Sequence, residues 1–248
     1  MENKKEHDCQ IPGKLEKDIS EHGWQVVMIP ATSYLPPFAY TVGLWENYGH
    51  PELIGFGLPI GLFHLILNKA GELVKSGSTI QINKEYEDFL ETYLTTFIPV
   101  DPRNLKDYFG AAIEHYQTMD FAALQLIWPD KNQRFPWQDG FEEKYKRLQP
   151  LLDRNATFKF IEERNTAIFT TKQWLEEAAP IMEVVHDHEG DWQFITEEWE
   201  EEDIITVSLE EMIQKDDSLN ELFNLDFGEG AVRESITSKW ERYKTDGE

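Results

Sequence analysis

The chain has 248 residues, with 40% hydrophobic and 13% aromatic content, which is the composition of a folded globular protein of one large or two ordinary domains. Its net charge of −24 is uneven, because residues 1–155 carry 15 Lys and Arg against 22 Asp and Glu, whereas residues 156–248 carry 8 against 25. Such a field repels phosphate backbones and anionic lipid, so we expect neither nucleic acid nor membrane as a partner. A basic protein surface would be attracted, although the acidic residues could also serve only to keep the protein soluble.

The N-terminal segment carries no targeting signal. Residues 1–14 are polar and are expected to form a flexible arm. The single cysteine, Cys9, lies in this arm, so neither a disulfide nor a thiolate metal site can be built. The segment lacks the apolar run of a signal peptide, and no part of the chain approaches about 18 consecutive apolar residues. These features predict a cytoplasmic protein.

Apolar periodicity predicts alternating elements in residues 15–155. A helix is expected over 15–22 and a longer one from Pro59 to Val74, each followed by a glycine that can end it. A third helix is expected from Asn104 to about Gln117. The strands are expected at 24–29, 38–44, 53–58, 79–82, 93–100 and 121–128, with a partly helical segment around 86–90.

The pattern restarts after a domain boundary near 153–157. A hairpin is expected around the turn HDHEGD, from Ile181–Val185 and Trp192–Ile195, and two capping boxes beginning at Ser208 and Ser218 should open short helices. Strands and helices mix without regular alternation in both halves. We therefore predict an α+β fold of two domains, 15–155 and an acidic 156–248, each a mostly antiparallel sheet packed with a few helices.

Several motifs of the first half occur in a fixed order: HGW at residue 22, PPFAYTVGLWENYGHPEL from residue 36, then QLIWPD and RFPW. Over residues 15–152 the chain resembles the bacterial family known as domain of unknown function 4262. The resemblance implies a domain identity and brings no catalytic or binding residues with it.

The second half resembles another family over residues 166–240. FTTKQWL, GDWQF, DDSLNELFNL and FGEGAVRES are similar to the domain of unknown function 2185 family, which is grouped with immunity proteins of bacterial toxin systems. The acidic run Glu197–Asp203 departs from the usual pattern of that family. The resemblance implies a role as an immunity protein.

One candidate ligand site lies in the opening strands, where His22, Tyr40, His50 and Glu52 fall at strand ends. His50 and Glu52 flank Pro51, so alternation on an extended segment would place them on the same side as a general acid–base pair. A flavin-type split barrel is a fold-level analogy for this stretch. The alternative, which the pattern favours, is that His50 and Glu52 only close the turn ENYGHPE.

Two further clusters have a functional and a structural interpretation. Arg134 with Trp128, Phe135 and Trp137 could bind a planar ligand, although aromatic packing under loops is commoner. His186 and His188 could offer two metal ligands with Asp191, but these residue types are also expected at a turn. No phosphate loop, dinucleotide turn or nucleophile elbow is present, so we expect no cofactor, no metal and no enzyme motif.

The acidic run is the favoured partner site. Its members are Glu197, Glu198, Trp199, Glu200, Glu201, Glu202 and Asp203. Six carboxylates around one tryptophan suit a cationic protein surface, because charge complementarity guides encounter and an aromatic side chain can anchor it. We therefore expect an interaction protein of the immunity or defence type that blocks a basic partner, plausibly a toxin. The alternative is a small-ligand binder or enzyme that uses the N-terminal sheet.

Overall fold

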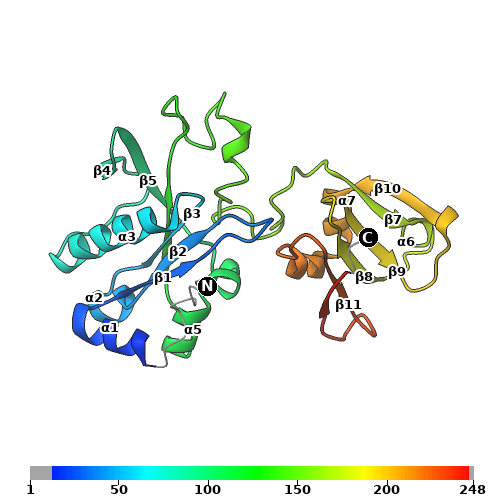
Figure 1. Cartoon of the computed structure of the whole chain (residues 1–248), viewed down its shortest axis with the longest axis horizontal. Coiled ribbons are helices and arrows are strands. Elements are labelled where there is room, and N and C mark those ends of the chain that lie inside the picture. Colours follow the sequence, from blue (N-terminus) through cyan, green and yellow to red (C-terminus); the bar gives the residue numbers. More distant parts are fainter. Residues whose placement is uncertain (1–12, 246–248) are drawn as a thin grey trace, which may run out of the picture. The chain divides into compact units, whose positions relative to one another are not determined.

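The computed structural model describes residues 13–245, which divide into two compact units (Figure 1). The first unit contains residues 13–31 and 36–156, and the second contains residues 32–35 and 157–245. Each unit has its own six-stranded, mostly antiparallel sheet, so the predicted α+β fold is confirmed. Cys9 and most of the predicted N-terminal arm lie outside the described residues.

The first sheet has the strand order β1-β2-β3-β6-β5-β4. Neighbouring strands are antiparallel except β3 and β6, which run parallel. The six strands are β1 (Gln25–Ile29), β2 (Phe38–Val42), β3 (Glu52–Phe56), β4 (Tyr86–Leu90), β5 (Tyr93–Pro99) and β6 (Ala123–Ile127).

Helices cover both faces of this sheet (Figure 1). Neighbouring residues of a strand point to opposite faces, so Ala39 joins the core beneath α3 while Tyr40 packs against Phe109 at a ring distance of 5.1 Å. The unit is thus a sheet between two helical layers. Its helical segments are α1 (Lys14–His22), α2 (Leu44–Tyr48), α3 (Ile60–Lys75), η1 (Pro102–Asn104), α4 (Leu105–Tyr108), α5 (Gly110–Tyr116) and η2 (Glu143–Tyr145).

Three predictions for the first unit were wrong. Residues 86–90, expected to be partly helical, form β4, and a register shift in its pairing with β5 hides the period of two that marks a strand. The expected helix 104–117 is interrupted at Phe109 (φ −112°, ψ 38°). This residue is fully buried, and its ring packs between Tyr40 and Phe121, which takes precedence over continuing the helix. Residues 79–82 form no strand.

The second sheet has the order β10-β7-β9-β8-β11-β12, and only β7 and β9 are parallel. Buried residues of β8 and β9, such as Val184, Trp192 and Phe194, form its interior. The strands are β7 (Ala167–Thr171), β8 (Ile181–His186), β9 (Trp192–Thr196), β10 (Ile204–Ser208), β11 (Glu229–Val232) and β12 (Glu241–Lys244). The helical segments are α6 (Lys172–Glu176), η3 (Glu201–Asp203), α7 (Leu209–Lys215) and η4 (Asp217–Leu222).

The predicted hairpin of β8 and β9 is confirmed, as is the cap at Ser208, whose hydroxyl accepts the Glu211 N–H at 3.2 Å. The cap expected at Ser218 is wrong, because Asp216 precedes η4 and its carboxylate accepts the Ser218 N–H. Strands β10, β11 and β12 were not predicted. The sequences of β11 and β12 are four residues long and carry charged residues, and they gain strand structure by pairing with neighbours in the sheet. The sequence of β10, IITVS, has the β-branched residues typical of a strand, so a local signal was present there.

Gly71 of α3 provides a test of the packing beneath the first sheet. A Cβ there would lie 2.3 Å from Cε2 of Trp24, whose indole also donates to Asn68 at 3.0 Å. We expect Gly71→Ala to lower the free energy of unfolding by about 1–3 kcal/mol, because overpacking outweighs the helix propensity of alanine, worth about 1 kcal/mol. Urea denaturation measures the change.

Gly61 of the same helix is the matched control, because nothing lies within 4 Å of a Cβ added there. Gly61→Ala should be neutral or should stabilise the protein by up to about 1 kcal/mol. Equal stability of the two variants would contradict the proposed packing of Gly71 against Trp24.

Candidate functional site

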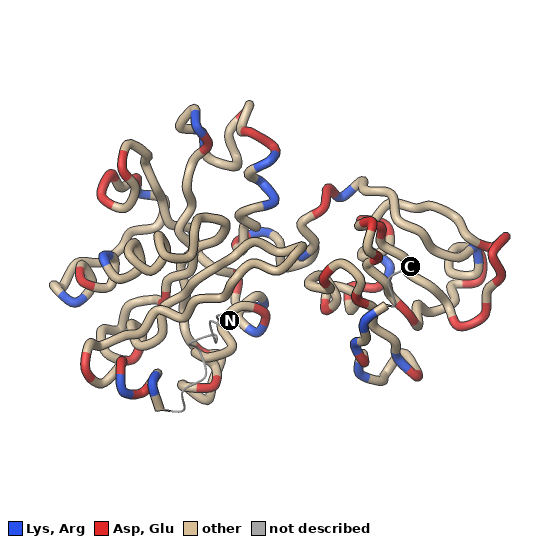
Figure 2. The backbone as a smooth tube through the Cα atoms, viewed as in Figure 1, with Lys and Arg blue, Asp and Glu red and all other residues tan. Residues whose placement is uncertain are grey.

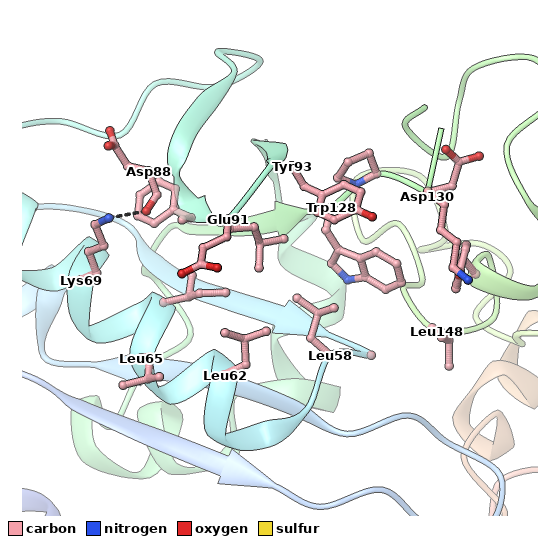
Figure 3. A pocket seen from close by; sticks show the side chains of 17 residues that line it. Leu58, Leu62, Leu65, Lys69, Asp88, Glu91, Tyr93, Trp128, Asp130 and Leu148 are labelled. Carbon is pink, nitrogen blue, oxygen red and sulfur yellow. Dashed lines mark hydrogen bonds between the residues drawn. The ribbon is translucent and has the colours of Figure 1, made fainter. Parts of the chain in front are cut away.

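A cavity of about 700 Å³ opens on the first unit (Figure 3). It lies between the first half of α3, the hairpin of β4 and β5, and segment 128–148, which follows β6. Its volume falls within the range of roughly 300–1,000 Å³ that is typical of small-molecule sites. The cavity therefore has the size of a ligand-binding site.

A stripe of α3 forms the floor of this cavity. Leu62, Leu65, Ile66 and Lys69 line it, and their spacing of three, four and seven places them along one side of the helix. Leu65 is 67% exposed, which is high for a leucine within a helix. Ile66 is buried and Leu62 is half-buried against the core, so Leu65 is the apolar side chain of this floor that protrudes into solvent.

Trp128 forms a fixed aromatic wall. Its indole Nε1 donates to the Phe56 carbonyl at 2.8 Å, and the side chain of Gln149 bonds both the backbone N–H and the carbonyl of Trp128. Tyr145 meets the indole edge-on at 5.5 Å. Phe89 completes the aromatic lining. Because the tryptophan is bonded at three points, this wall is in place before any ligand binds.

The charged residues of the cavity point in different directions (Figure 3). The Glu91 side chain extends from the hairpin toward α3 and forms no hydrogen bond or ion pair with any described residue. The Asp88 carboxylate points away, and Lys69 donates to the Asp88 carbonyl. Asp130 also points away, accepting three backbone N–H groups. Glu91 is therefore the carboxylate available to a ligand.

The pKa of Asp130 reflects two opposing influences. Removal from solvent pushes the pKa of the carboxyl up, but the N–H groups of Arg134, Asn132 and Glu142 favour the charged form and leave its pKa below the ordinary value. Asp130 is thus an ionised anchor for the loop after β6. It is not a proton donor for chemistry in the cavity.

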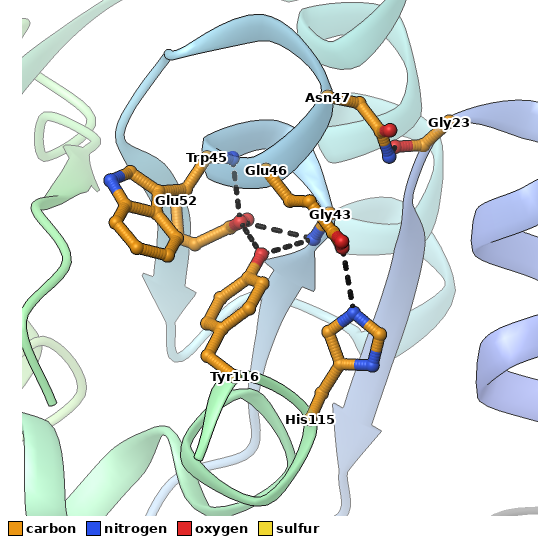
Figure 4. Close-up of polar contacts among 8 residues, drawn as sticks. All are labelled: Gly23, Gly43, Trp45, Glu46, Asn47, Glu52, His115 and Tyr116. Atoms are coloured by element: carbon orange, nitrogen blue, oxygen red, sulfur yellow. Dashed lines mark hydrogen bonds and ion pairs between the residues drawn. The ribbon is translucent and has the colours of Figure 1, made fainter. Parts of the chain in front are cut away.

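Glu52 lies outside the cavity, at the centre of a buried hydrogen-bond network (Figure 4). Its carboxylate accepts hydrogen bonds from the hydroxyls of Thr41 and Tyr116, each at 2.5 Å, and from the backbone N–H groups of Gly43 at 3.0 Å and Trp45 at 2.9 Å. These donors belong to β2, α5 and the start of α2. Burial raises the pKa of Glu52 to about 7, although each of the four hydrogen bonds opposes the increase.

His50 is buried and does not bond Glu52. Its Nδ1 lies 2.7 Å from the Pro51 carbonyl, and its Nε2 accepts the Ile80 N–H at 3.2 Å. A carbonyl requires a protonated Nδ1 and the N–H requires an unprotonated Nε2, so these contacts define a neutral imidazole. Burial lowers the pKa of His50, which agrees with that form. The imidazole joins two backbone segments.

The other ligand residues predicted from the sequence lie apart from this network. His22 is exposed at the end of α1, and its carbonyl accepts from Lys75. The Tyr40 hydroxyl accepts the Ala111 N–H at 3.1 Å. Arg134 is exposed and donates to the Gly140 carbonyl at 2.6 Å. Neither these residues nor Glu52 and His50 line the cavity, so the structure does not bring the five together in one site.

The acidic run belongs to the second unit, where Asp and Glu are drawn in red in Figure 2, and its side chains differ in exposure along its length. Residues 197–202 are exposed, including Trp199 at 43%, whereas Asp203 is buried. Asp203 accepts from the side chains of Lys172 and Gln173 and from the Glu200 N–H at 3.0 Å. Lys172 makes the largest contribution to lowering the pKa of Asp203 to about 2. Asp203 fixes one end of the run, and the other six side chains remain accessible.

The two histidines of the H-x-H motif lie in different environments. His186 is fully buried, stacks on Trp192 at 4.0 Å and has Nδ1 2.8 Å from the Leu225 carbonyl. His188 is exposed, with Nε2 3.3 Å from the Thr245 hydroxyl. Within residues 13–245, no group of three potential ligands is arranged to hold a metal ion.

Sequence reasoning did not identify the cavity. The sequence pattern placed Trp128 in a different cluster, with Arg134, Phe135 and Trp137. A signal was present, because Leu65 is apolar on the flank of α3 that also carries exposed His64 and partly exposed Asn68. The wall formed by β4 and β5 has no such signal, because the pattern of residues 86–90 predicts a partly helical segment.

Comparison with known proteins gives one match. The model of the family described as "Domain of unknown function (DUF4262)" matches residues 18–142, which include most of the cavity. No curated protein and no solved structure matches the chain. Nothing in the comparisons supports the resemblance of the second half to the 2185 family. Among the described residues, no helix is long and apolar enough to cross a membrane.

The raised pKa of Glu52 predicts a pH dependence of stability. The carboxyl titrates at about 7 in the folded protein and at 4.5 when unperturbed. Its contribution is therefore complete below pH 4.5 and is lost as the pH rises through 7, by on the order of 3 kcal/mol. We expect Glu52→Gln to remove this loss, as measured by urea denaturation between pH 4 and 8.

Glu114→Gln provides a control, because Glu114 is an exposed carboxylate of the same unit. Its stability profile should follow that of the wild type. If the Glu52→Gln profile also followed the wild type across this range, Glu52 would not be the group that titrates there.

Proposed function

The chain belongs to the DUF4262 family, whose domain has no assigned function, and we propose that this domain binds a small, largely apolar molecule in the cavity over α3. One observation carries the proposal, which is a cavity of ligand size whose apolar floor on α3, with exposed Leu65, lies beside the fixed wall of Trp128. The exposed side chain of Leu65 and the apolar walls of the cavity would gain free energy if a ligand removed them from water. A ligand of suitable size would remove this surface from solvent.

The lining suggests the shape and polarity of the ligand. Aromatic walls from Phe89, Trp128 and Tyr145 suit a flat apolar body. Glu91 supplies a carboxylate without a protein partner, which suits a positively charged or hydrogen-bond-donating end. Because Glu91 is exposed, its charge orients the ligand more than it adds affinity.

The proposal is for binding and not for catalysis. No serine, threonine, cysteine or histidine is among the described residues that line the cavity. The Asp130 carboxylate is occupied by three backbone N–H groups. The described lining thus has no hydroxyl or thiol nucleophile of the serine, threonine or cysteine type beside a histidine base.

Leu62→Trp should close the cavity and abolish binding of an apolar probe. The probe is 2-naphthylmethylamine, a cation with a flat body, titrated by isothermal calorimetry at pH 7. Ile82→Trp is the matched control, because Ile82 is 50% exposed in the same unit and does not line the cavity. We expect Leu62→Trp to weaken binding at least tenfold and Ile82→Trp to leave it unchanged.

The same titration tests the polarity of the site. The neutral analogue 2-naphthylmethanol should bind more weakly to the wild type than the amine does, and Glu91→Gln should narrow that difference. Asp88→Asn, on the same hairpin with its carboxylate pointing away, should not narrow it. Equal binding of the amine to wild type and Leu62→Trp would refute the proposal.

We also propose a second function, in which residues 197–202 bind a basic protein. The exposed indole of Trp199 within the acidic run favours it, because tryptophan is frequent among the residues that dominate interface energies. The excess of acidic residues in 156–248, 25 against 8, would speed encounter with a cationic partner. By the resemblance to immunity proteins, that partner would be a toxin.

Two variants of the acidic run should affect different properties, one the binding of a basic partner and the other the stability of the fold. With an arginine-rich peptide as the probe, Trp199→Ala should weaken binding at least fivefold while the Tm stays nearly constant, because Trp199 is half exposed and arginine stacks on indole. Asp203→Ala should instead lower the Tm, since it removes the acceptor shared by Lys172, Gln173 and Glu200. Fluorescence titration and thermal melts measure the two effects. A large drop in Tm for Trp199→Ala with unchanged binding would refute this second function.

A further inference from the structure

A second cavity, of about 470 Å³, lies entirely within the second unit. It is bounded by the connection from α6 to β8, the end of α7 with the start of η4, and the segment after β11. Its apolar lining includes Leu175 and Ile236, which are 48% and 64% exposed. The cavity is independent of the site over α3.

Arg233 is the polar residue built most deeply into this cavity. Its side chain is only 4% exposed. The Nε–H donates to the Ile181 carbonyl at 2.9 Å, one Nη2–H donates to Asp216 at 3.3 Å, and the guanidinium lies 4.5 Å from the centre of the Trp240 ring. The guanidinium is thereby held in one orientation.

The remaining end of Arg233 has no protein partner. Its Nη1 forms no hydrogen bond within the described residues, and it is not among the buried polar atoms that lack both a partner and contact with solvent. It therefore reaches solvent, and Arg233 is among the residues that line the cavity. Two of the five N–H donors of this nearly buried cation are paired, so both donors of Nη1 and one of Nη2 are left for an acceptor that the described residues do not supply.

Lys215 adds a second positive charge to the lining. Its ammonium lies 3.9 Å from the centre of the Trp174 ring and 3.9 Å from a carboxylate oxygen of Glu211. Asp216 is the acidic residue of the lining, and its carboxylate also accepts the N–H and hydroxyl of Ser218. The lining is therefore net positive, although residues 156–248 carry 25 acidic residues against 8 basic ones.

We propose that this cavity binds a carboxylate carried on a small apolar body. A carboxylate can accept hydrogen bonds from Nη1 of Arg233 and from Lys215, both charge-assisted. The apolar body would cover Leu175 and Ile236. The acidic surroundings do not prevent this, because salt screens charges beyond about 8–10 Å whereas the two cations act in direct contact.

A small organic acid and the C-terminus of a peptide can both supply a carboxylate on an apolar body. Phenylacetate and the uncharged phenylacetamide form one matched pair of probes, and a Gly-Gly-Phe peptide with a free or an amidated C-terminus forms the other. Calorimetry on the full chain should show phenylacetate binding at least tenfold more tightly than phenylacetamide, since only the carboxylate satisfies the two cations. Tighter binding of the free peptide than of phenylacetate would identify a peptide terminus as the source.

Two charge-matched variants locate the site. Lys215→Gln should weaken phenylacetate binding at least fivefold, whereas Lys244→Gln, an exposed residue of β12 in the same unit, should not change it. The NMR signal of the Arg233 Nε–H should shift on addition of phenylacetate to the wild type. The proposal would be overturned if phenylacetate and phenylacetamide bound equally well or if neither bound. It would also be overturned if Lys215→Gln and Lys244→Gln weakened phenylacetate binding equally.

Discussion

The first unit depends on one buried carboxylate. Glu52 is fully buried, and an isolated carboxylate in such a place would cost several kcal/mol. Four donors from β2, the start of α2 and α5 surround it. These four hydrogen bonds offset part of the free-energy cost of burying the carboxylate. The network therefore couples the sheet to the two helical segments. It also satisfies N–H groups at the start of α2 that have no partner within the helix.

The same sheet positions the cavity on its other face. Trp128 follows β6, and its indole donates to the carbonyl of Phe56 at the end of β3, so the parallel pairing of these strands fixes the wall. Gly55 in β3 leaves room for Phe63, since a Cβ there would lie 2.4 Å from that ring. Phe63 in turn fixes α3 on the sheet, and Leu65 on another side of the helix remains exposed to solvent. The ligand surface is thus held by rigid elements, as binding geometry requires.

Local sequence patterns correctly predicted the strands and helices whose formation depends mainly on neighbouring residues. The strands 24–29, 38–44 and 53–58 and helix α3 have clear periodicity, and each is present within a few residues of its predicted limits. The pairing of β3 with β6 joins residues about 70 positions apart, and a single sequence carries no signal for it. Phe109 shows the same limit, because tertiary packing of its ring interrupts a helix that its neighbours favour.

Glu52 was recognised as a residue of interest, but its role depended on partners that no local rule could supply. Tyr116 lies 64 positions away in α5, and its hydroxyl reaches the carboxylate only because that helix packs on the sheet. His50, two residues earlier, has entirely different partners. Sequence spacing therefore singled out Glu52 and His50 as candidate site residues. Their burial and their hydrogen-bond partners in the fold determine what each of them does.

The net charge of the chain and the charges that line each cavity lead to different expectations about what the protein binds. The total of −24 describes how a distant macromolecule is attracted or repelled. A small ligand meets only the few groups that it touches: unpaired Glu91 over an apolar floor in the first unit, and Arg233 with Lys215 in the second. By the two proposals these cavities favour ligands of opposite charge, and the one lined by cations lies in the more acidic part of the chain. Its selectivity must therefore come from orientation and desolvation of a single guanidinium, because the surrounding field acts against it.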